Sequence, residues 1–437
     1  MCEVSIMLFL LNETRIRGIK SVCKTVSLSH TNKVIGPDDF QKCYIKAIYG
    51  SNGAGKSALV HAYSIYRAVV TREYPFKDTS FSSLLAKLIN KTTRECSVGV
   101  SFSISFPGGN ILRFRHDVAI GVDGGGAPYL RKESLDELNL RGDTKRHLFS
   151  LEDGVYTNGT MPKEFFEKLG CSFFRQNSVV SFARSKKRNE GYSFLRYVYA
   201  FASSLQVCFG SLEDDRGAFG LASFLAEEGL EEGDSWMTKN APLSFQAADP
   251  NCLWAMPSEE EERYRALEPS LERFLKLAKP SLRGVSLLFK RDGVSSYCSP
   301  IFHYDGYSVD YEFESTGVKK LCQLFLALYS ASKGSIVVID EMDAGLHDVF
   351  FERLLEYFIG LSECQLVLTT HNINAMESLK RLRKSIDVLT DECEIVSWVS
   401  KGKSSPSLFY TRGALGGTPL NLHPFDFAGI FESEGRS

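Results

Sequence analysis

Apolar and small residues alternate along the segment SVGVSFSISF, residues 97–106. Apolar side chains occupy every second position from Val98 to Phe106, with serine or glycine between them. A period of two places the apolar side chains on one face, which predicts a half-buried antiparallel strand. The segment ILRFRHDVAI, residues 111–120, follows a glycine-containing turn, and we expect it to be the partner strand.

Continuous apolar runs predict buried strands elsewhere in the chain. Such runs lie at residues 5–11, 335–339 and 366–370. The first run has no basic segment before it and no small-residue cleavage site after it, so we interpret it as a strand and not as a secretion signal. No stretch approaches the ~18 apolar residues that a membrane span needs, and no membrane association is expected.

The pattern changes between residues 180 and 283, where helix-like stretches carry charged clusters such as ARSKKRN and EEEERYRAL. This change predicts a helical insert (180–283) between an N-terminal lobe (1–179) and a C-terminal lobe (284–437). The cationic runs at 184–188 and 380–384 are typical of solvated surfaces, with a nucleic-acid or partner contact as the alternative.

Composition bounds the class of protein. A chain of 437 residues with 43% hydrophobic and 24% charged residues is an ordinary globular protein with room for two or three domains. Lys plus Arg (51) nearly balances Asp plus Glu (53), so nucleic-acid binding is open but not indicated by charge. Eleven scattered cysteines without a C-x-x-C pair are typical of a reducing cytoplasm and predict neither a disulfide framework nor a zinc site.

The segment AIYGSNGAGKSALVHAY, residues 47–63, reads as a strand, a glycine-rich loop and a helix. Residues 50–57 fit the pattern G-x-x-x-x-G-K-[S/T], in which backbone N–H groups surround a phosphate. The predicted phosphate-binding residues are Asn52, Gly53, Ala54, Gly55, Lys56 and Ser57. This P-loop predicts a nucleotide site.

Two acids end the apolar run at 335–339 and supply the partner that a P-loop needs. We expect Asp340 to share a magnesium ion with the Ser57 hydroxyl and Glu341 to polarise the attacking water. The run LVLTT ends in His371, which is placed to contact the γ-phosphate. These residues are the predicted catalytic and metal-binding groups.

The segment ESTGVKKL, residues 314–321, opens a strongly apolar helix. The Ser315 hydroxyl, the Gly317 amide and the positive end of the helix together predict an anion site, although Ser315 as a simple helix cap is the alternative. In the usual sheet topology this site cannot reach the phosphate on its own P-loop. We therefore expect it to close on the nucleotide of a second subunit.

The order of these motifs, with Asp-x-Gly-Leu-His at 343–347 after the paired acids, resembles the ABC-type ATPase head. Lys56 lies 259 residues before Ser315, and Ser315 only 25 before Asp340, which resembles the SMC, RecF and OLD-like branch with its long insertion. The form Glu-Ser-Thr-Gly is most similar to compact AAA-annotated ATPases of bacterial phage-defence systems, such as OLD-like, Septu, retron-associated and PARIS systems.

The resemblance implies an α/β P-loop NTPase with a mixed central sheet, an antiparallel β subdomain and the helical insert. It implies ATP and Mg²⁺ as cofactors, Gln176 as a further magnesium contact, with an ordinary surface amide as the alternative, and Asp343 as a residue that acts across the subunit interface. The implied protein is a homodimer or higher homo-oligomer that hydrolyses ATP as a conformational switch and controls a separate effector. No nuclease pattern follows His371.

Two alternatives use the same motifs. A DNA-binding maintenance ATPase similar to RecF or SMC heads would predict a continuous basic stripe, against which the near-neutral charge speaks mildly. A transporter nucleotide domain is disfavoured by the long separation of Lys56 from Ser315.

Overall fold

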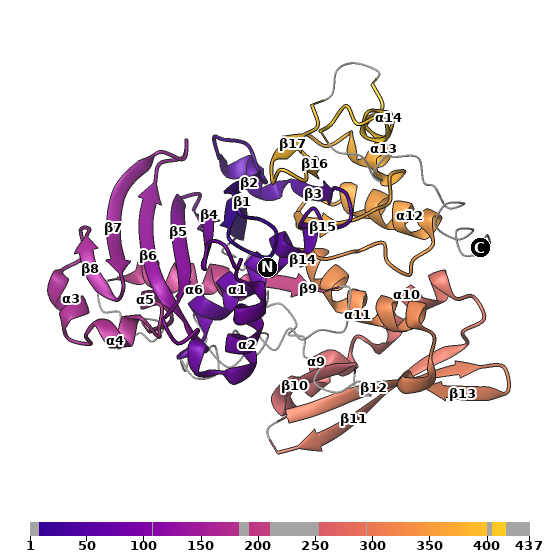
Figure 1. Ribbon diagram of the computed structural model, residues 1–437. Coiled ribbons are helices and arrows are strands. Elements are labelled where there is room, and N and C mark those ends of the chain that lie inside the picture. Colours follow the sequence, from indigo (N-terminus) through magenta and orange to yellow (C-terminus); the bar gives the residue numbers. More distant parts are fainter. Residues whose placement is uncertain are drawn as a thin grey trace, which may run out of the picture.

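The computed structural model describes residues 8–106, 108–182, 192–209, 253–293, 295–399 and 404–416. Figure 1 shows three sheets with helices between and around them, and the sheet of strands β4–β8 lies farthest from the small sheet of β10–β13. The predicted α/β fold with a mixed central sheet and an antiparallel subdomain is confirmed. Among the described residues, no helix is both long enough and apolar enough to cross a membrane.

The central sheet has six strands in the order β17-β16-β3-β15-β14-β9, parallel except for β17. The strands are β3 (Cys43–Tyr49), β9 (Leu205–Cys208), β14 (Ile336–Ile339), β15 (Cys364–Thr369), β16 (Ile386–Leu389) and β17 (Ile395–Ser397). Helices α1 (Lys56–Thr71) and α6 (Ser193–Ser204) share a core with one face of this sheet. Helices α11 (Thr316–Ala331), α12 (Asp348–Ile359) and α13 (Ala375–Leu379) share a core with the other.

Burial on both faces explains the apolar run that ends at the paired acids. Ile336 and Val338 pack in the core that contains α1 and α6, whereas Val337 and Ile339 pack in the core that contains α11 and α12. A strand covered on both sides reads as a continuous apolar run and not as an alternation. The predicted buried strand is therefore the central-sheet strand β14.

The antiparallel sheet has seven strands in the order β2-β1-β4-β5-β6-β7-β8. Their bounds are β1 (Leu8–Arg17), β2 (Val26–Ser29), β4 (Glu95–Ser105), β5 (Ile111–Val122), β6 (Pro128–Leu138), β7 (Thr144–Glu152) and β8 (Val155–Asn158). The predicted hairpin is present, with Val98 opposite Val118. The run expected at residues 5–11 is described from Leu8 onward.

The strand at 97–106 is not half-buried as its alternation predicted. Ser101 and Ser103 on its second face are also buried, at 3% and 0% exposure. The Ser103 hydroxyl donates to the Asn12 side-chain carbonyl (2.7 Å), which replaces the hydrogen bond that it would make to water. A serine can therefore lie on a buried strand face when a neighbouring strand supplies a partner for its hydroxyl, as Asn12 does for Ser103.

A smaller sheet contains β10 (Trp254–Pro257), β11 (Gly284–Asp292), β12 (Ser295–Tyr304) and β13 (Tyr307–Asp310). It shares a core with α10 (Glu268–Ala278) and with one face of α11. The remaining helices are α2 (Thr79–Leu88), α3 (Lys163–Glu167), α4 (Cys171–Phe174), α5 (Val179–Phe182), α9 (Glu261–Arg265) and α14 (Pro406–Thr411), with 3₁₀ turns η1 (Pro37–Gln41), η2 (Pro75–Lys77), η4 (Ser258–Glu260) and η5 (Tyr311–Phe313).

The structure departs from the expectation of a purely helical insert at 180–283. Strand β9 from this range joins the central sheet beside β14, and α6 contacts α1. Strand β10 pairs with β12, which lies beyond the predicted boundary at 283. These pairings join residues far apart in sequence, which local periodicity cannot reveal. The cationic run 184–188 and residues 210–252 lie outside the described residues.

Candidate functional site

The carboxyl ends of three neighbouring parallel strands form one edge of the central sheet. Strand β3 leads into the P-loop, β14 ends immediately before Asp340, and β15 ends two residues before His371. The three strands are adjacent in the order β3-β15-β14, so their carboxyl ends meet at the same edge. The topology therefore brings the predicted phosphate, metal and γ-phosphate residues to one place.

Two glycines give the P-loop its shape. Gly55 has a φ of +109° immediately before α1, and a Cβ there would lie 2.8 Å from the Val22 side chain. Gly50 has a φ of +153°, and a Cβ there would lie 2.6 Å from the Leu389 carbonyl oxygen. Both positions exclude a larger residue, which explains why the loop begins and ends with glycine.

The Lys56 side chain folds back over the P-loop. Its ammonium group donates to the carbonyl oxygens of Gly50 (2.8 Å) and Ser51 (2.9 Å), and the residue is 7% exposed. Burial lowers the pKa of Lys56, and the carboxylates of Asp340 and Glu341 oppose that shift. Lys56 thus lies within electrostatic range of the paired acids.

A threonine that the sequence analysis missed holds both acids in place. The Thr369 hydroxyl donates to Asp340 Oδ1 (2.5 Å) and accepts from the Glu341 N–H (2.7 Å). Asp340 is 7% exposed, whereas the Glu341 side chain is exposed and its backbone φ is +45°. A left-handed conformation at a residue other than glycine costs free energy and is typical of functional sites. This conformation leaves the Glu341 side chain exposed to solvent at the edge of the sheet.

Asp343 connects the acidic segment to the histidine strand. Its Oδ2 accepts from the His371 N–H (3.0 Å), and its buried Oδ1 has no hydrogen-bond partner among the described residues. Removal from water and the positive charge of Lys56 lower the pKa of His371 below its usual 6.5, which favours the neutral ring. A neutral imidazole can accept or donate at a phosphate.

Lys320 is a second residue that the sequence analysis did not assign. It lies in the first turns of α11, is 6% exposed, and its Nζ has no hydrogen-bond partner among the described residues. Burial lowers the pKa of Lys320, and the nearby carboxylates of Glu341 and Asp340 oppose the shift. Lys320 of helix α11 therefore lies within electrostatic range of the paired acids.

Strand β9 lies beside β14 and extends this edge of the sheet. The Cys208 carbonyl accepts from the Asp340 N–H (2.8 Å), and the next side chain, Phe209, lies against the His61 ring of α1 with centroids 4.6 Å apart. No motif in the sequence identifies this strand as the neighbour of Asp340.

The predicted anion site has the expected helix-start geometry. Ser315 is the N-cap of α11, and its N–H donates to Glu314 Oε1 (2.8 Å). The Lys279 ammonium donates to the same oxygen (2.8 Å) and the Tyr304 hydroxyl to Glu314 Oε2. The Ser315 side chain makes no cap hydrogen bond within its own helix, which leaves the hydroxyl available to another acceptor or donor.

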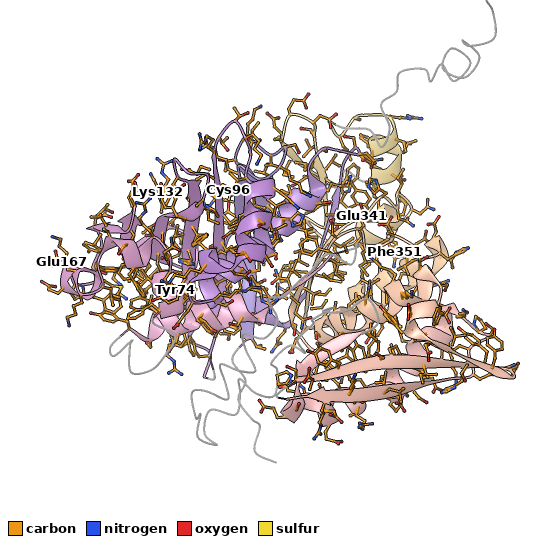
Figure 2. All side chains as sticks on the ribbon, turned by 60° about the horizontal axis from the view of Figure 1, so that its bottom comes forward. Tyr74, Cys96, Lys132, Glu167, Glu341 and Phe351 are labelled. Carbon is orange, nitrogen blue, oxygen red and sulfur yellow. The ribbon has the colours of Figure 1, made fainter. Side chains whose placement is uncertain are left out.

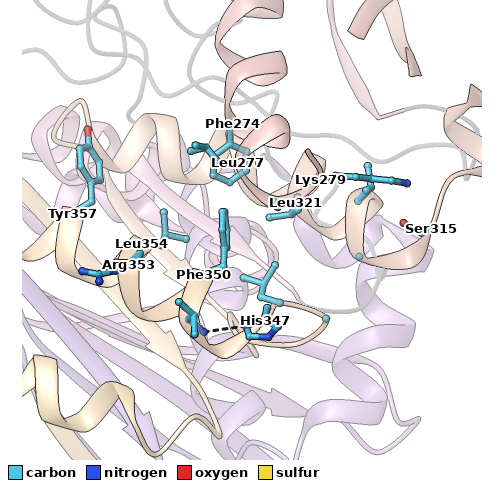
Figure 3. Close-up of a pocket in the computed structure, with 16 residues that line it drawn as sticks. Phe274, Leu277, Lys279, Ser315, Leu321, His347, Phe350, Arg353, Leu354 and Tyr357 are labelled. Carbon is cyan, nitrogen blue, oxygen red and sulfur yellow. Dashed lines mark hydrogen bonds between the residues drawn. The ribbon is translucent and has the colours of Figure 1, made fainter. Parts of the chain in front are cut away.

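Ser315 and Gly317 open into a cavity of about 1100 Å³ that Figure 3 shows. A Cβ on Gly317 would lie 3.3 Å from the Gly345 carbonyl oxygen, so the signature segment (residues 314–321) and the 343–347 loop are in close contact. The cavity is lined mainly by apolar side chains from α10 and α12, including the exposed Leu277. No P-loop residue lines it.

The structure does not bring Gln176 to this edge. The next residue, Asn177, accepts from the Tyr74 N–H (2.7 Å), and the rings of Tyr74 and Phe173 are in contact. Tyr74 follows the end of α1, a helix of 16 residues or ~24 Å that begins at Lys56. Gln176 therefore lies at the opposite end of α1 from the P-loop, and Figure 2 shows Tyr74 well apart from Glu341. Its assignment as a magnesium contact is corrected.

The residues at the edge fit a magnesium ion that is held together with a nucleotide. Asp340 supplies a buried carboxylate whose orientation Thr369 fixes, and Ser57 supplies a hydroxyl in the first turn of α1. Mg²⁺ prefers hard oxygen ligands and takes one or two from the protein, with waters and phosphate oxygens completing its shell. The donor set is therefore suited to Mg²⁺ with ATP.

Comparison with known proteins identifies one family match. Residues 267–377 match the family described as "AAA domain, putative AbiEii toxin, Type IV TA system". This range contains the signature segment, the paired acids and His371. A comparison with curated proteins finds no match.

Two solved structures of the recombination mediator protein RecF in the RecFOR pathway, one with ATP and one with ATPrS, are similar over most of the chain. Each shares 14% identity with this protein, with a TM-score of 0.39, and the alignment covers 91% of this chain and 100% of RecF.

Proposed function

We propose that this protein binds and hydrolyses ATP with Mg²⁺ and uses hydrolysis as a conformational switch. The observation that carries the proposal is the convergence of Lys56, the Asp340–Glu341 pair and His371 at the carboxyl ends of adjacent strands. The Thr369 bridge holds the acids in one arrangement, and preorganised charge is the main source of catalysis in phosphoryl transfer.

Each group has a defined task in this proposal. The P-loop amides and Lys56 bind the β- and γ-phosphates, and Ser57 with Asp340 holds the magnesium ion, which neutralises phosphate charge. Glu341 accepts a proton from the attacking water, for which its exposed carboxylate is suited. His371 binds the γ-phosphate oxygen as a neutral imidazole, and Asp343 orients the backbone that carries this histidine.

We propose further that Ser315 and Gly317 bind the nucleotide of a second copy of this chain. The cavity into which they open contains no P-loop residue of their own chain, and its rim exposes Leu277, Val349 and Tyr357 at 74%, 58% and 56%. An apolar surface beside an anion site fits a protein partner better than solvent. A two-fold pair would contain two composite ATP sites.

For the biological setting, we propose a cytoplasmic bacterial antiphage complex in which this ATPase controls a separate effector. The support is the toxin–antitoxin description of the family that matches residues 267–377 and the signature Glu-Ser-Thr-Gly at 314–317. The alternative is a RecF- or SMC-like ATPase of DNA maintenance. Salt-sensitive binding of duplex DNA in the presence of ATP would favour that alternative.

The test of the ATPase proposal uses Lys56→Ala and Glu341→Gln. Lys56→Ala should lose ATP binding. Glu341→Gln should bind ATP but hydrolyse it at least about a hundredfold more slowly, because it keeps the side-chain size and loses the base. Matched controls are Lys42→Ala, before β3, and Glu363→Gln, before β15. Both controls should retain wild-type binding and hydrolysis.

The readouts are nucleotide binding by calorimetry, phosphate release, and particle mass with and without ATP. We expect Glu341→Gln to accumulate an ATP-dependent assembly that Lys56→Ala cannot form. Wild-type hydrolysis by Glu341→Gln would overturn the assignment of the base, and ATP binding by Lys56→Ala would overturn the assignment of the phosphate site.

A further inference from the structure

Two cysteines lie side by side at the amino-terminal edge of the central sheet, opposite the nucleotide edge. Cys43 begins β3 and Cys364 begins β15, and they are directly paired in the parallel register. Paired residues of neighbouring strands lie about 4.8 Å apart, within the Cα separation of roughly 4.4–6.8 Å that disulfides span. Both side chains belong to the core that contains α11 and α12, so they point to the same face of the sheet.

The two thiols have different surroundings. The Cys43 S–H donates to the Phe358 carbonyl oxygen (3.0 Å). The neighbouring Cys364 thiol lowers the pKa of Cys43, whereas Cys43 and burial raise the pKa of Cys364. The pair is therefore asymmetric, with Cys43 the readier thiolate.

Cys43 is also the more solvent-accessible of the two thiols. Cys364 is 3% exposed, whereas Cys43 is partly exposed and lines a cavity of about 470 Å³. Three cationic residues, Lys42, Arg383 and Lys384, line the same cavity. Positive charge near a thiol favours its thiolate, which is the nucleophile in cysteine oxidation.

We propose that Cys43 and Cys364 form a redox-modification site that a peroxide converts reversibly into an intramolecular disulfide. The Cys43 thiolate attacks one oxygen of hydrogen peroxide and releases hydroxide, which leaves a sulfenic acid. The Cys364 sulfur then attacks the Cys43 sulfur, and the Cys364 proton leaves with the sulfenic oxygen as water. The hydroxide takes up the proton that Cys43 lost on ionisation, so the two thiols lose two electrons in total and the peroxide is reduced to two molecules of water.

The disulfide would join the two strands whose opposite ends carry the nucleotide site. Strand β3 leads to the P-loop, and β15 ends in Thr369, which holds Asp340. The bond forms without moving the strands, because the register already matches its span. The redox proposal does not rest on the proposed ATPase activity, because it can be tested without ATP.

The experiment treats the full-length reduced protein with hydrogen peroxide, alkylates the remaining thiols after denaturation, and maps tryptic peptides without reduction. We expect a linked species of peptides 43–46 and 354–380, lighter by two hydrogens than the separate peptides and lost on treatment with dithiothreitol. In Cys364→Ala the link should be absent, and Cys43 should give a sulfenic acid that dimedone traps.

The exposed residues Cys23 and Cys171 are the internal control. Both are more exposed than Cys43 and Cys364, so exposure alone would favour their oxidation over that of the pair. Recovery of Cys43 and Cys364 as alkylated thiols at a peroxide dose that oxidises Cys23 or Cys171 would overturn the proposal. The wild-type map decides this even if Cys364→Ala fails to fold.

Discussion

The Thr369 hydroxyl donates a hydrogen bond of 2.5 Å to the Asp340 carboxylate across the neighbouring strands β15 and β14. The same hydroxyl accepts from the Glu341 N–H, so one side chain orients both acids. A carboxylate that is held by a buried neighbour keeps its geometry before a metal arrives. The strand that leads to His371 thereby also controls the proposed magnesium ligand and base.

Replacement of Thr369 by valine should therefore impair the site more than the fold. Valine has nearly the same shape but removes both hydrogen bonds, and we expect Mg²⁺-dependent hydrolysis to fall about ten- to hundredfold. Buried Asp340 and the Glu341 N–H each lose a hydrogen bond, so the free energy of unfolding should fall by about 1–3 kcal/mol. Phosphate release over a magnesium titration and urea unfolding measure the two effects.

Thr370→Val is the matched control for Thr369→Val. The Thr370 hydroxyl is also buried, but it accepts from the Asn372 N–H (3.0 Å) and does not contact the acids. This variant should lose stability while its magnesium dependence stays at the wild-type value. An equal change in magnesium dependence in both variants would contradict a specific role for Thr369.

Lys320 should compete electrostatically with magnesium. Its buried ammonium lies within electrostatic range of the acids and has no hydrogen-bond partner among the described residues. Lys320→Met keeps the volume and removes the charge, so less Mg²⁺ should be needed for half-maximal hydrolysis, by several-fold, with little loss of stability. The control is Lys319→Met, because the Lys319 ammonium donates to the Glu312 carbonyl (2.5 Å) at the surface. An unchanged magnesium requirement in Lys320→Met would refute the competition.

Ser315→Arg tests the composite site. Arginine adds bulk and charge where the γ-phosphate of the second copy is proposed to bind, so each chain should bind ATP while assembly and turnover fall, roughly a hundredfold for turnover. The control is Ser332→Arg at the opposite end of α11, where a cation suits the helix dipole. Unimpaired ATP-dependent mass in Ser315→Arg would show that the signature segment acts within one chain.

Sequence patterns predicted those site residues that follow directly from strand ends. Lys56, Asp340 and His371 each come shortly after a parallel strand, and carboxyl ends of parallel strands meet at one edge whatever the order of the strands. The hairpin of residues 97–106 and 111–120 could also be predicted from sequence, because alternation and a short turn define it locally.

Residues that depend on long-range packing could not be predicted. The family resemblance assigned Gln176 to the magnesium site, but a contact between its neighbour Asn177 and Tyr74 holds it far from the P-loop. Strand β9 pairs with β14, 131 residues later in the chain at Leu205 and Ile336, and no local signal specifies that pairing. Whether Lys320 faces the acids or solvent depends on the packing of α11 against the sheet.

The titration of His371 provides a test of the γ-phosphate contact. Removal from water and Lys56 lower the pKa of this histidine below 6.5, so between that pKa and about 6.5 the folded protein binds fewer protons than the unfolded chain. The contribution of His371 to stability is therefore present above pH 6.5 and is lost as the pH falls below it.

NMR titration of the ring, assigned with His371→Gln, should give a midpoint below 6.5 without nucleotide. In Glu341→Gln loaded with Mg²⁺ and ATP, the negative γ-phosphate should raise that midpoint, because an adjacent anion favours the imidazolium. With ADP in place of ATP the midpoint should stay near its nucleotide-free value. The same midpoint with ATP and with ADP would show that His371 does not contact the γ-phosphate.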